Sequence, residues 1–451
     1  MSTIKPPQMA IQRCFTLPFF MSILSLTTIL LVLARQKDST LIPSPILNTG
    51  SLFRWGAKEE EKVKEARVRM VVFGDSWVDD RPESGMSGRG KSWVRVACEE
   101  IDCASYLNYA SSQPVDEYPA NPPKGALTKN KIHIASHEEK KHSHVSYAPL
   151  NLLPDLGQQI QSYIAENPPS ETQVETIFCI SHGFWDVYSL ASLDLERAII
   201  ATDASVKELF HQLDILYAHH AKSYLHSNTK VENTNPPLFP VIIPHLLDPS
   251  LVPGWKTHRP VPIPPSTMAE QQRNALSLTS RWNIGMENRM LSWLKEMPTF
   301  YRNEIEKTEH PIIDTENHES RNATNEAVTV IKDIFYFDLA QKVLDILAEH
   351  QMQVAGISDA RGRGTNPSPY QNINQACLRE SANEEDNEAD FLELNGHLLC
   401  KYPEEYLYWD AFNIGSRAKE NIGKELSKMI KIGDSLRRQF NERSSNSVGS
   451  I

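Results

Sequence analysis

Ser76 is the first residue whose type and position suit catalysis. An apolar run from Met70 to Phe73 stops at Gly74-Asp75-Ser76. This pattern predicts a buried β-strand that ends in a tight turn and presents a serine hydroxyl. Sites in α/β sheets usually form at the carboxyl ends of strands. Alone, the tripeptide fits a nucleophile and an ordinary strand-closing turn equally well.

Two later stretches carry side chains that could complete such a site. His182-Gly183-Phe184-Trp185-Asp186 follows the apolar run 174–181, and Trp409-Asp410-Ala411-Phe412-Asn413 lies near the end of the chain. A serine becomes a nucleophile when a base, typically an imidazole oriented by a carboxylate, removes its proton. The oxyanion that then forms needs hydrogen-bond donors. The three stretches therefore have to meet in space if Ser76 is catalytic.

The elements that would bring them together alternate between strands and helices. The predicted strands are 70–73, 104–110, 174–181, 238–243 and 331–337. The predicted helices are 92–101, 150–165, 203–226, 268–296 and 339–350, and residues 402–429 close the domain. This alternation predicts a flavodoxin-like three-layer α/β/α fold with a parallel sheet of about five strands. Residues 114–148 and 356–395 are predicted to be long loop insertions.

Taken together, the three stretches resemble the motif blocks of the SGNH, or GDSL-type, hydrolase family. Phe73 to Ser76 resembles the nucleophile block, and Gly183 to Asp186 stands in the place of the Gly-x-Asn-Asp block. Trp409 to Asn413 resembles the final Asp-x-x-His block, so the likeness covers roughly residues 67–425. The family's glycine block would fall in the turn after residues 107–111, which holds no glycine.

The resemblance implies a serine ester hydrolase, an esterase or acylhydrolase, without cofactor or metal. Ser76 would be the nucleophile and Asp410 the orienting carboxylate, with Gly183, Trp185, Asp186 and Asn413 lining the oxyanion site and pocket. The expected substrates are an ester-containing small molecule, a lipid or an acylated glycan.

Two positions depart from the family pattern, and they leave the activity open. Asn413 replaces the catalytic histidine, and an amide has no basic nitrogen. Trp185 replaces the oxyanion asparagine. His182 and His245 both follow predicted strands, and His182 is the better candidate for a substitute base. The alternative is a catalytically inactive relative that binds a glycan, a lipid or a protein partner.

Composition and cysteine spacing exclude several other classes. The net charge of −11 without a basic stripe argues against a nucleic-acid partner. No C-x-x-C motif is present, and no G-x-G-x-x-G follows a strand, so zinc, redox and nucleotide-binding functions are disfavoured. Cys98–Cys103 and Cys377–Cys400 are possible disulfide pairs. His133, His137, His142 and His144 are interpreted as a solvated loop, with a metal site as the alternative.

The N-terminal segment predicts a secretory-pathway protein. Residues 1–13 form a tail, and the uncharged run 14–34 matches the roughly 20 residues that cross a bilayer as a helix. A single-pass signal anchor is favoured over a cleaved signal peptide. A linker at 35–66, an SGNH-like domain at 67–430 and a tail at 431–451 complete the predicted organisation.

Overall fold

The structure is a computed structural model of the 451-residue chain. It describes residues 68–80, 89–113, 125–137, 152–167, 175–226, 237–296, 299–301, 327–380, 391–394 and 397–448. The chain divides into two units, Met1–Thr49 and Gly50–Ile451, and all described residues lie in the second. The predicted anchor at 14–34 and the linker at 35–66 lie outside the described residues. Among the residues that are described, no helix combines the length and apolarity that a membrane span requires.

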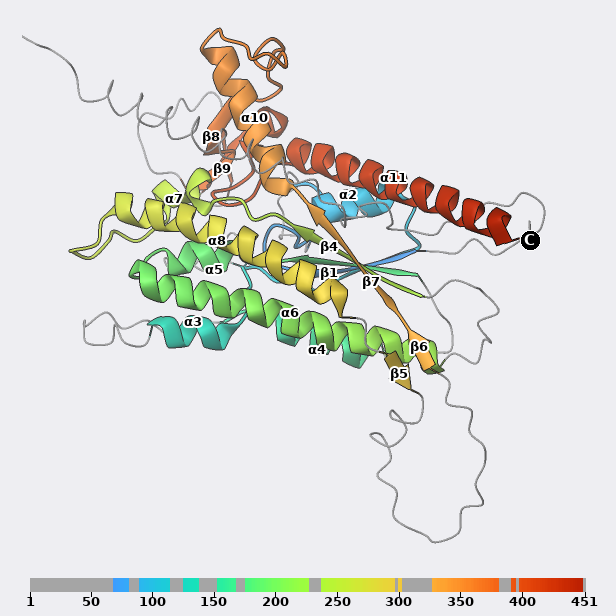
Figure 1. The fold of residues 1–451 in the computed structure, drawn as a ribbon. Coiled ribbons are helices and arrows are strands. Elements are labelled where there is room, and N and C mark those ends of the chain that lie inside the picture. Colours follow the sequence, from blue (N-terminus) through green and yellow to red (C-terminus); the bar gives the residue numbers. More distant parts are fainter. Residues whose placement is uncertain are drawn as a thin grey trace, which may run out of the picture. The chain divides into compact units, whose positions relative to one another are not determined.

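A five-stranded parallel sheet forms the centre of the fold (Figure 1). Its strands are β1 (Arg69–Gly74), β2 (Ser105–Asn108), β3 (Thr176–Ser181), β4 (Leu238–Pro244) and β7 (Ile331–Phe337), in the order β2-β1-β3-β4-β7. This order is flavodoxin-like and confirms the predicted fold class. β1 and β3 read as unbroken apolar runs because helices cover both faces of the sheet.

Helices form a layer on each side of this sheet. In Figure 1, α4 (Leu156–Glu166), α6 (Leu195–His226) and α8 (Met268–Lys295) lie on one side, and α2 (Trp93–Glu100) and α11 (Ser416–Val448) on the other. α5 (Phe184–Leu190) packs against α6 and α8, and α3 (Asn130–His137) packs against α5 and α6. α10 (Leu339–Val354) contacts α11. These contacts confirm the three-layer arrangement.

Several elements differ from the sequence predictions. The region 356–395, predicted to be a loop, contains β8 (Asn372–Ala376), β9 (Leu378–Glu380) and β10 (Phe391–Leu394). They form small sheets with β11 (His397–Cys400) and β12 (Tyr406–Tyr408). Such short strands give too little alternation to recognise from sequence. α3 lies within the predicted insertion 114–148, and α11 runs through the predicted tail to Val448.

The remaining short elements are β5 (Thr299–Tyr301), β6 (Ala327–Thr329), η4 (Pro249–Leu251), α7 (Gly254–Thr257) and η6 (Pro403–Glu405).

Both proposed cysteine pairs form disulfides. The Cα atoms of Cys98 and Cys103 are 5.2 Å apart, and those of Cys377 and Cys400 are 4.9 Å apart. Cys179 is a buried free thiol. Two structural disulfides are typical of a protein that folds in an oxidising, secretory compartment.

Candidate active site around Ser76

The turn that carries Ser76 is held from beneath by α4. Gln159 of α4 accepts a hydrogen bond from the Gly74 N–H at 2.8 Å and donates to the Gly74 carbonyl at 3.0 Å. A Cβ at Gly74 would lie 2.4 Å from Val78 and 2.7 Å from the Ser181 carbonyl, so this position requires glycine. Gly74 and the side-chain amide of Gln159 together fix the position at which β1 ends.

The hydroxyl of Ser76 is bound by an indole. Trp185 Nε1 donates to Ser76 Oγ at 3.1 Å, and no other hydrogen bond to this oxygen is found among the described residues. Trp185 is fully buried in the first turn of α5, where the rings of Phe412 and Tyr188 pack against it. Ser76 itself is only 4% exposed. An indole nitrogen is a donor only, so it cannot take the serine proton.

Asp410 and Asn413 form a compact turn. Asn413 Nδ2 donates to both carboxylate oxygens of Asp410, at 3.0 and 2.8 Å. The backbone N–H groups of Phe412 and Asn413 each donate to Asp410 Oδ1 at 2.8 Å. Asn413 Oδ1 is buried and has no hydrogen-bond partner in the described part of the chain. The amide thus binds the carboxylate as an imidazole N–H would, but it offers no base.

Gly183 and Asp186, from the block that also holds Trp185, have different roles. Asp186 accepts hydrogen bonds from the N–H and hydroxyl of Thr128 and from the hydroxyl of Ser205. Burial raises the pKa of Asp186 to about 6. Gly183 has a φ of 114°, and a Cβ there would lie 2.5 Å from the Trp282 ring. Asp186 therefore ties the start of α5 to Thr128 and to Ser205 of α6, and neither Asp186 nor Gly183 forms a described hydrogen bond with the Ser76 hydroxyl.

The two histidines proposed as substitute bases do not bind Ser76. His182 is buried, and neither ring nitrogen has a hydrogen-bond partner within the described residues. Burial lowers the pKa of His182 to about 3, so its imidazole is neutral. The ring of His245 lies between two carboxylates, 3.7 Å from Glu287 and 3.5 Å from Asp338.

Asp75, which precedes the serine, is electrostatically unusual. Its carboxyl is fully buried, and burial raises its pKa to about 8, with further contributions from the charges of Asp186 and Asp79. Asp75 Oδ1 accepts a hydrogen bond from the Trp77 N–H at 3.0 Å. The side chain is therefore protonated near neutral pH and provides a hydroxyl donor at the end of β1.

Gly125 is a site residue that the sequence analysis missed. It pairs with Ser112, and a Cβ there would lie 2.2 Å from Trp185 Nε1 and 3.1 Å from the Cβ of Asp75. The close approach lets the indole reach Ser76. No motif spacing marks Gly125, because its contact with Trp185 joins residues that are far apart in the sequence.

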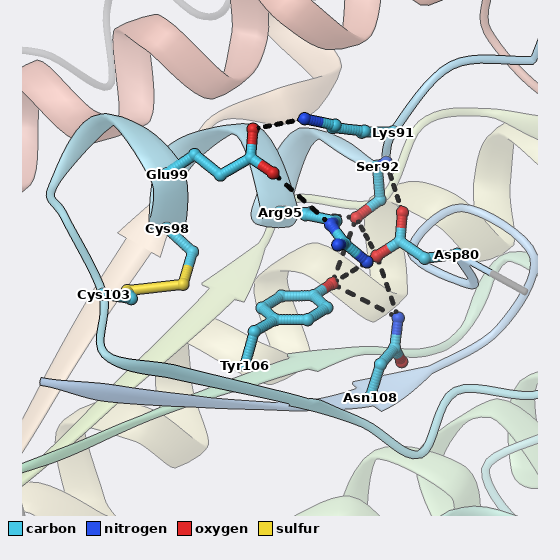
Figure 2. Close-up of polar contacts among 9 residues, drawn as sticks. All are labelled: Asp80, Lys91, Ser92, Arg95, Cys98, Glu99, Cys103, Tyr106 and Asn108. Carbon is cyan, nitrogen blue, oxygen red and sulfur yellow. Dashed lines mark hydrogen bonds and ion pairs between the residues drawn. A yellow bond between two sulfur atoms is a disulfide. The ribbon is translucent and has the colours of Figure 1, made fainter.

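A polar network around Asp80 anchors the far end of the loop that carries Ser76. Figure 2 shows the Asp80 carboxylate facing Ser92, Tyr106 and Asn108. Asp80 accepts from the N–H and hydroxyl of Ser92, from the Tyr106 hydroxyl and, at 3.1 Å, from Asn108 Nδ2. Ser92 is the N-cap of α2. Asp80 therefore ties the end of the Ser76 loop to α2 and β2, which is a structural role.

A scan against protein-family models and a search of curated proteins both gave no match. The likeness to SGNH hydrolases therefore depends on the three motif blocks and on the fold that brings them together. Chemically, the described site offers a serine with one fixed donor and a carboxylate occupied by an amide. It can accept hydrogen bonds and bind polar groups, but it lacks a base beside the serine.

Proposed function

We propose that the protein is a divergent SGNH-fold protein that binds a ligand without hydrolysing it. The observation that carries this proposal is the donor-only indole of Trp185 at Ser76 Oγ. A serine hydroxyl is a weak nucleophile unless a base accepts its proton. Removing a member of a catalytic triad typically lowers turnover by roughly 10⁴–10⁶. A chain without the base is therefore expected to bind rather than to turn over.

The environment of Ser76 supports the same proposal. Trp185, Tyr188 and Phe412 are buried and pack against one another, with ring centroids 4.8–5.5 Å apart. The cluster holds the indole whose N–H donates to Ser76 Oγ. Arg89 also donates to the Ser76 carbonyl at 2.8 Å and holds the loop in place. This packing keeps a donor-only group on Ser76 Oγ, which supports the absence of acyl transfer.

A second candidate is the serine ester hydrolase that the motif blocks imply. The observation in its favour is again the Trp185 N–H, because a donor 3.1 Å from Ser76 Oγ is close enough to serve an oxyanion. This candidate needs a base from elsewhere in the chain, and His182 would have to move to supply it. Its substrates would be those expected of the family, namely small esters, lipids or acylated glycans.

The proposed location is the secretory pathway or the cell surface. The two disulfides fit an oxidising compartment, and residues 14–34 have the composition of a signal anchor or signal peptide. A ligand at a membrane surface, such as a lipid or an acylated glycan, would then be within reach. The charge of −11 makes a nucleic acid an unsuitable partner.

Hydrolysis assays separate the two candidates. The full-length chain is compared with Ser76→Ala and His182→Ala on p-nitrophenyl acetate, butyrate and decanoate. We expect equal background rates for all three proteins, because no base binds Ser76 Oγ among the residues that the structure describes. Turnover that depends on Ser76 would instead support the hydrolase, and its simultaneous loss in His182→Ala would identify the base.

A further inference from the structure

An uncharged, proline-rich loop joins α7 to α8. Residues 260–269 (PVPIPPSTMA) contain no charged side chain. Val261 is 87% exposed, more than any other large apolar side chain in the described part, and Ile263 is 61% exposed. Figure 1 shows this loop projecting away from the helices that flank it. Two neighbouring apolar side chains exposed on a projecting loop indicate a surface that contacts something other than water.

The base of the loop is fixed to the rest of the protein. The buried guanidinium of Arg259 stacks over the Trp255 ring, with its carbon 3.9 Å from the ring centroid. It also donates to the Tyr188 carbonyl at 2.7 Å and to Gln271 Oε1 at 2.5 Å. At the other end, the Thr267 hydroxyl caps α8. Because both ends are held, little conformational entropy is left to lose when the loop binds.

The backbone of the loop carries few hydrogen-bond donors. Four of the seven residues 260–266 are prolines, which have no N–H. The N–H of Ser266 donates to the Ile263 carbonyl, so it is already satisfied. That leaves the N–H groups of Val261 and Ile263. An apolar medium penalises unpaired backbone donors, and this segment therefore enters one at a lower cost than an ordinary loop.

The turn at Ser266 also decides between two kinds of partner. Proline-rich segments bind the aromatic grooves of other proteins when they form an extended polyproline helix. Here the hydrogen bond between Ser266 and Ile263 closes a turn within the segment, which interrupts such a helix. A bilayer interface does not require an extended backbone, because it accepts apolar surface of any shape. The loop therefore suits a lipid surface better than a proline-binding domain.

Other exposed apolar side chains lie among charges. Ile200 of α6 is 64% exposed and lies one turn from Glu196 and Asp203. Val354 is 75% exposed at the end of α10, and the charged segment 359–363 follows it. Charged side chains enter the apolar part of a bilayer at high cost. Loop 260–266 is therefore distinguished by its absence of charge as well as by its exposure.

A bilayer lies within reach of the loop if residues 14–34 form the predicted anchor. Residues 35–67 separate this anchor from the described part, and a chain of that length spans at most about 120 Å. A folded domain of this size has a radius of gyration of about 20 Å. The connection is therefore long enough for any face of the domain to meet the membrane.

We propose that loop 260–266 docks on a phospholipid bilayer, with Val261 and Ile263 inserted where the head groups meet the acyl chains. Two aliphatic side chains alone give weak binding, and the anchor raises the effective concentration of lipid around the loop. The proposal goes beyond the proposed function, because it holds whether or not Ser76 is catalytic.

The docking loop is connected to the candidate active site. Arg259, at the base of the loop, binds the Tyr188 carbonyl. The Tyr188 ring packs against Trp185, which donates to Ser76 Oγ. Docking would therefore bring the Ser76 end of the sheet to the lipid surface.

Acyl-chain quenching in the full-length chain tests the proposal. A nitrobenzoxadiazole label is attached at Ile263→Cys in a chain that also carries Cys14→Ser, so that the buried Cys179 is the only other free thiol. The chain is reconstituted with phosphatidylcholine vesicles, with or without bromines on the acyl chains. The matched control carries the label at Val354→Cys, an exposed valine outside the loop. We expect the bromines to quench the label at position 263 at least about twice as strongly as the label at position 354.

A charge in the loop should abolish this contact. Val261→Asp is expected to reduce the quenching at position 263 to the level at position 354, because the carboxylate resists entry into the bilayer. Val354→Asp should leave the quenching at position 263 unchanged, and melting temperatures check that both variants are folded. Equal quenching at positions 263 and 354 without these aspartates, or unchanged quenching in Val261→Asp, would overturn the proposal. The first of these results would leave a protein as the partner of the loop.

Discussion

Asn413 stands where the motif resemblance implies a histidine, and its amide can supply one half of what a histidine would supply there. Its amide N–H groups bind both oxygens of Asp410, as an imidazole N–H would bind one of them. The other half, a basic nitrogen directed to the serine, is chemically absent from an amide. The indole N–H of Trp185 donates a hydrogen bond to the Ser76 hydroxyl. At the scale of single residues, the described site therefore has hydrogen-bond donors at Ser76 and Asp410 and no base bound to the serine.

Asp75 gives a prediction at this scale. The folded protein holds its proton up to about pH 8, whereas the unfolded chain releases it near 3.8. The stability that Asp75 contributes is therefore complete below pH 4 and is lost as pH rises through 8. Asp75→Asn cannot ionise and escapes this loss. Its melting temperature, measured between pH 4 and 9, should increase relative to wild type as pH rises.

The control for this measurement is Ser76→Ala, which leaves Asp75 in place. Its melting curve against pH should run parallel to that of the wild type. If Asp75→Asn also runs parallel to the wild type across the whole range, Asp75 is not protonated in the folded protein.

At the scale of elements, the ends of the strands set the positions of the site residues. The register pairs Gly74 of β1 with Ser181 of β3, so the Ser76 turn and the start of α5 lie side by side. Gln159 of α4 fixes the end of β1, and the Asp80 network fixes the loop that leaves it. The Asp410 turn precedes α11, which packs against α2.

The Asp410 turn yields a stability prediction. Asp410→Ala leaves the N–H groups of Phe412 and Asn413 without their acceptor in a buried turn, which should cost at least about 2 kcal/mol. Asn413→Ala removes only the side-chain bonds and should cost less. Urea denaturation of both variants measures the difference. A smaller loss in Asp410→Ala than in Asn413→Ala would contradict this role of the carboxylate.

The disulfides provide a second prediction about elements. Cys377 and Cys400 are separated by 23 residues in sequence, and Cys98 and Cys103 by 5. A disulfide that closes a longer loop restricts the unfolded chain more. The double variant C377A/C400A should therefore lose roughly 3 kcal/mol and C98A/C103A roughly 2 kcal/mol. Chemical denaturation tests the ordering, and a larger loss in C98A/C103A would contradict it.

At the scale of the whole molecule, the sequence predicts the sheet well and the site only in part. The central strands β1, β3 and β4 are recognisable because parallel strands covered on both faces are mostly apolar, whereas the edge strands β2 and β7 keep polar residues. The contacts of Ser76 are harder to predict than the strands. Trp185 lies 109 positions away in sequence, and its contact with Ser76 depends on the close approach at Gly125. Trp185 belongs to the Gly183–Asp186 block and is predicted to line the site, whereas Gly125 belongs to no motif. Side-chain packing over such separations is fixed by the fold and cannot be read from local spacing.

The whole molecule also gives evidence about the compartment of the protein, but not about its activity. The disulfides at Cys98–Cys103 and Cys377–Cys400 connect the chain to an oxidising environment. The predicted anchor and linker lie outside the described residues, so attachment to a membrane stays a prediction. The fold is that of many proteins with unrelated activities, and the function therefore has to be argued from the site.

Reaction of Ser76 with a fluorophosphonate probe tests the central claim most directly, because only an activated serine forms the adduct. Intact-mass measurement and peptide mapping follow the reaction in wild type, Asn413→His and the double variant N413H/S76A. The account predicts no adduct on Ser76 in the wild type, an adduct in Asn413→His, and none in the double variant. An adduct on Ser76 in the wild type, formed as fast as in Asn413→His, would contradict it.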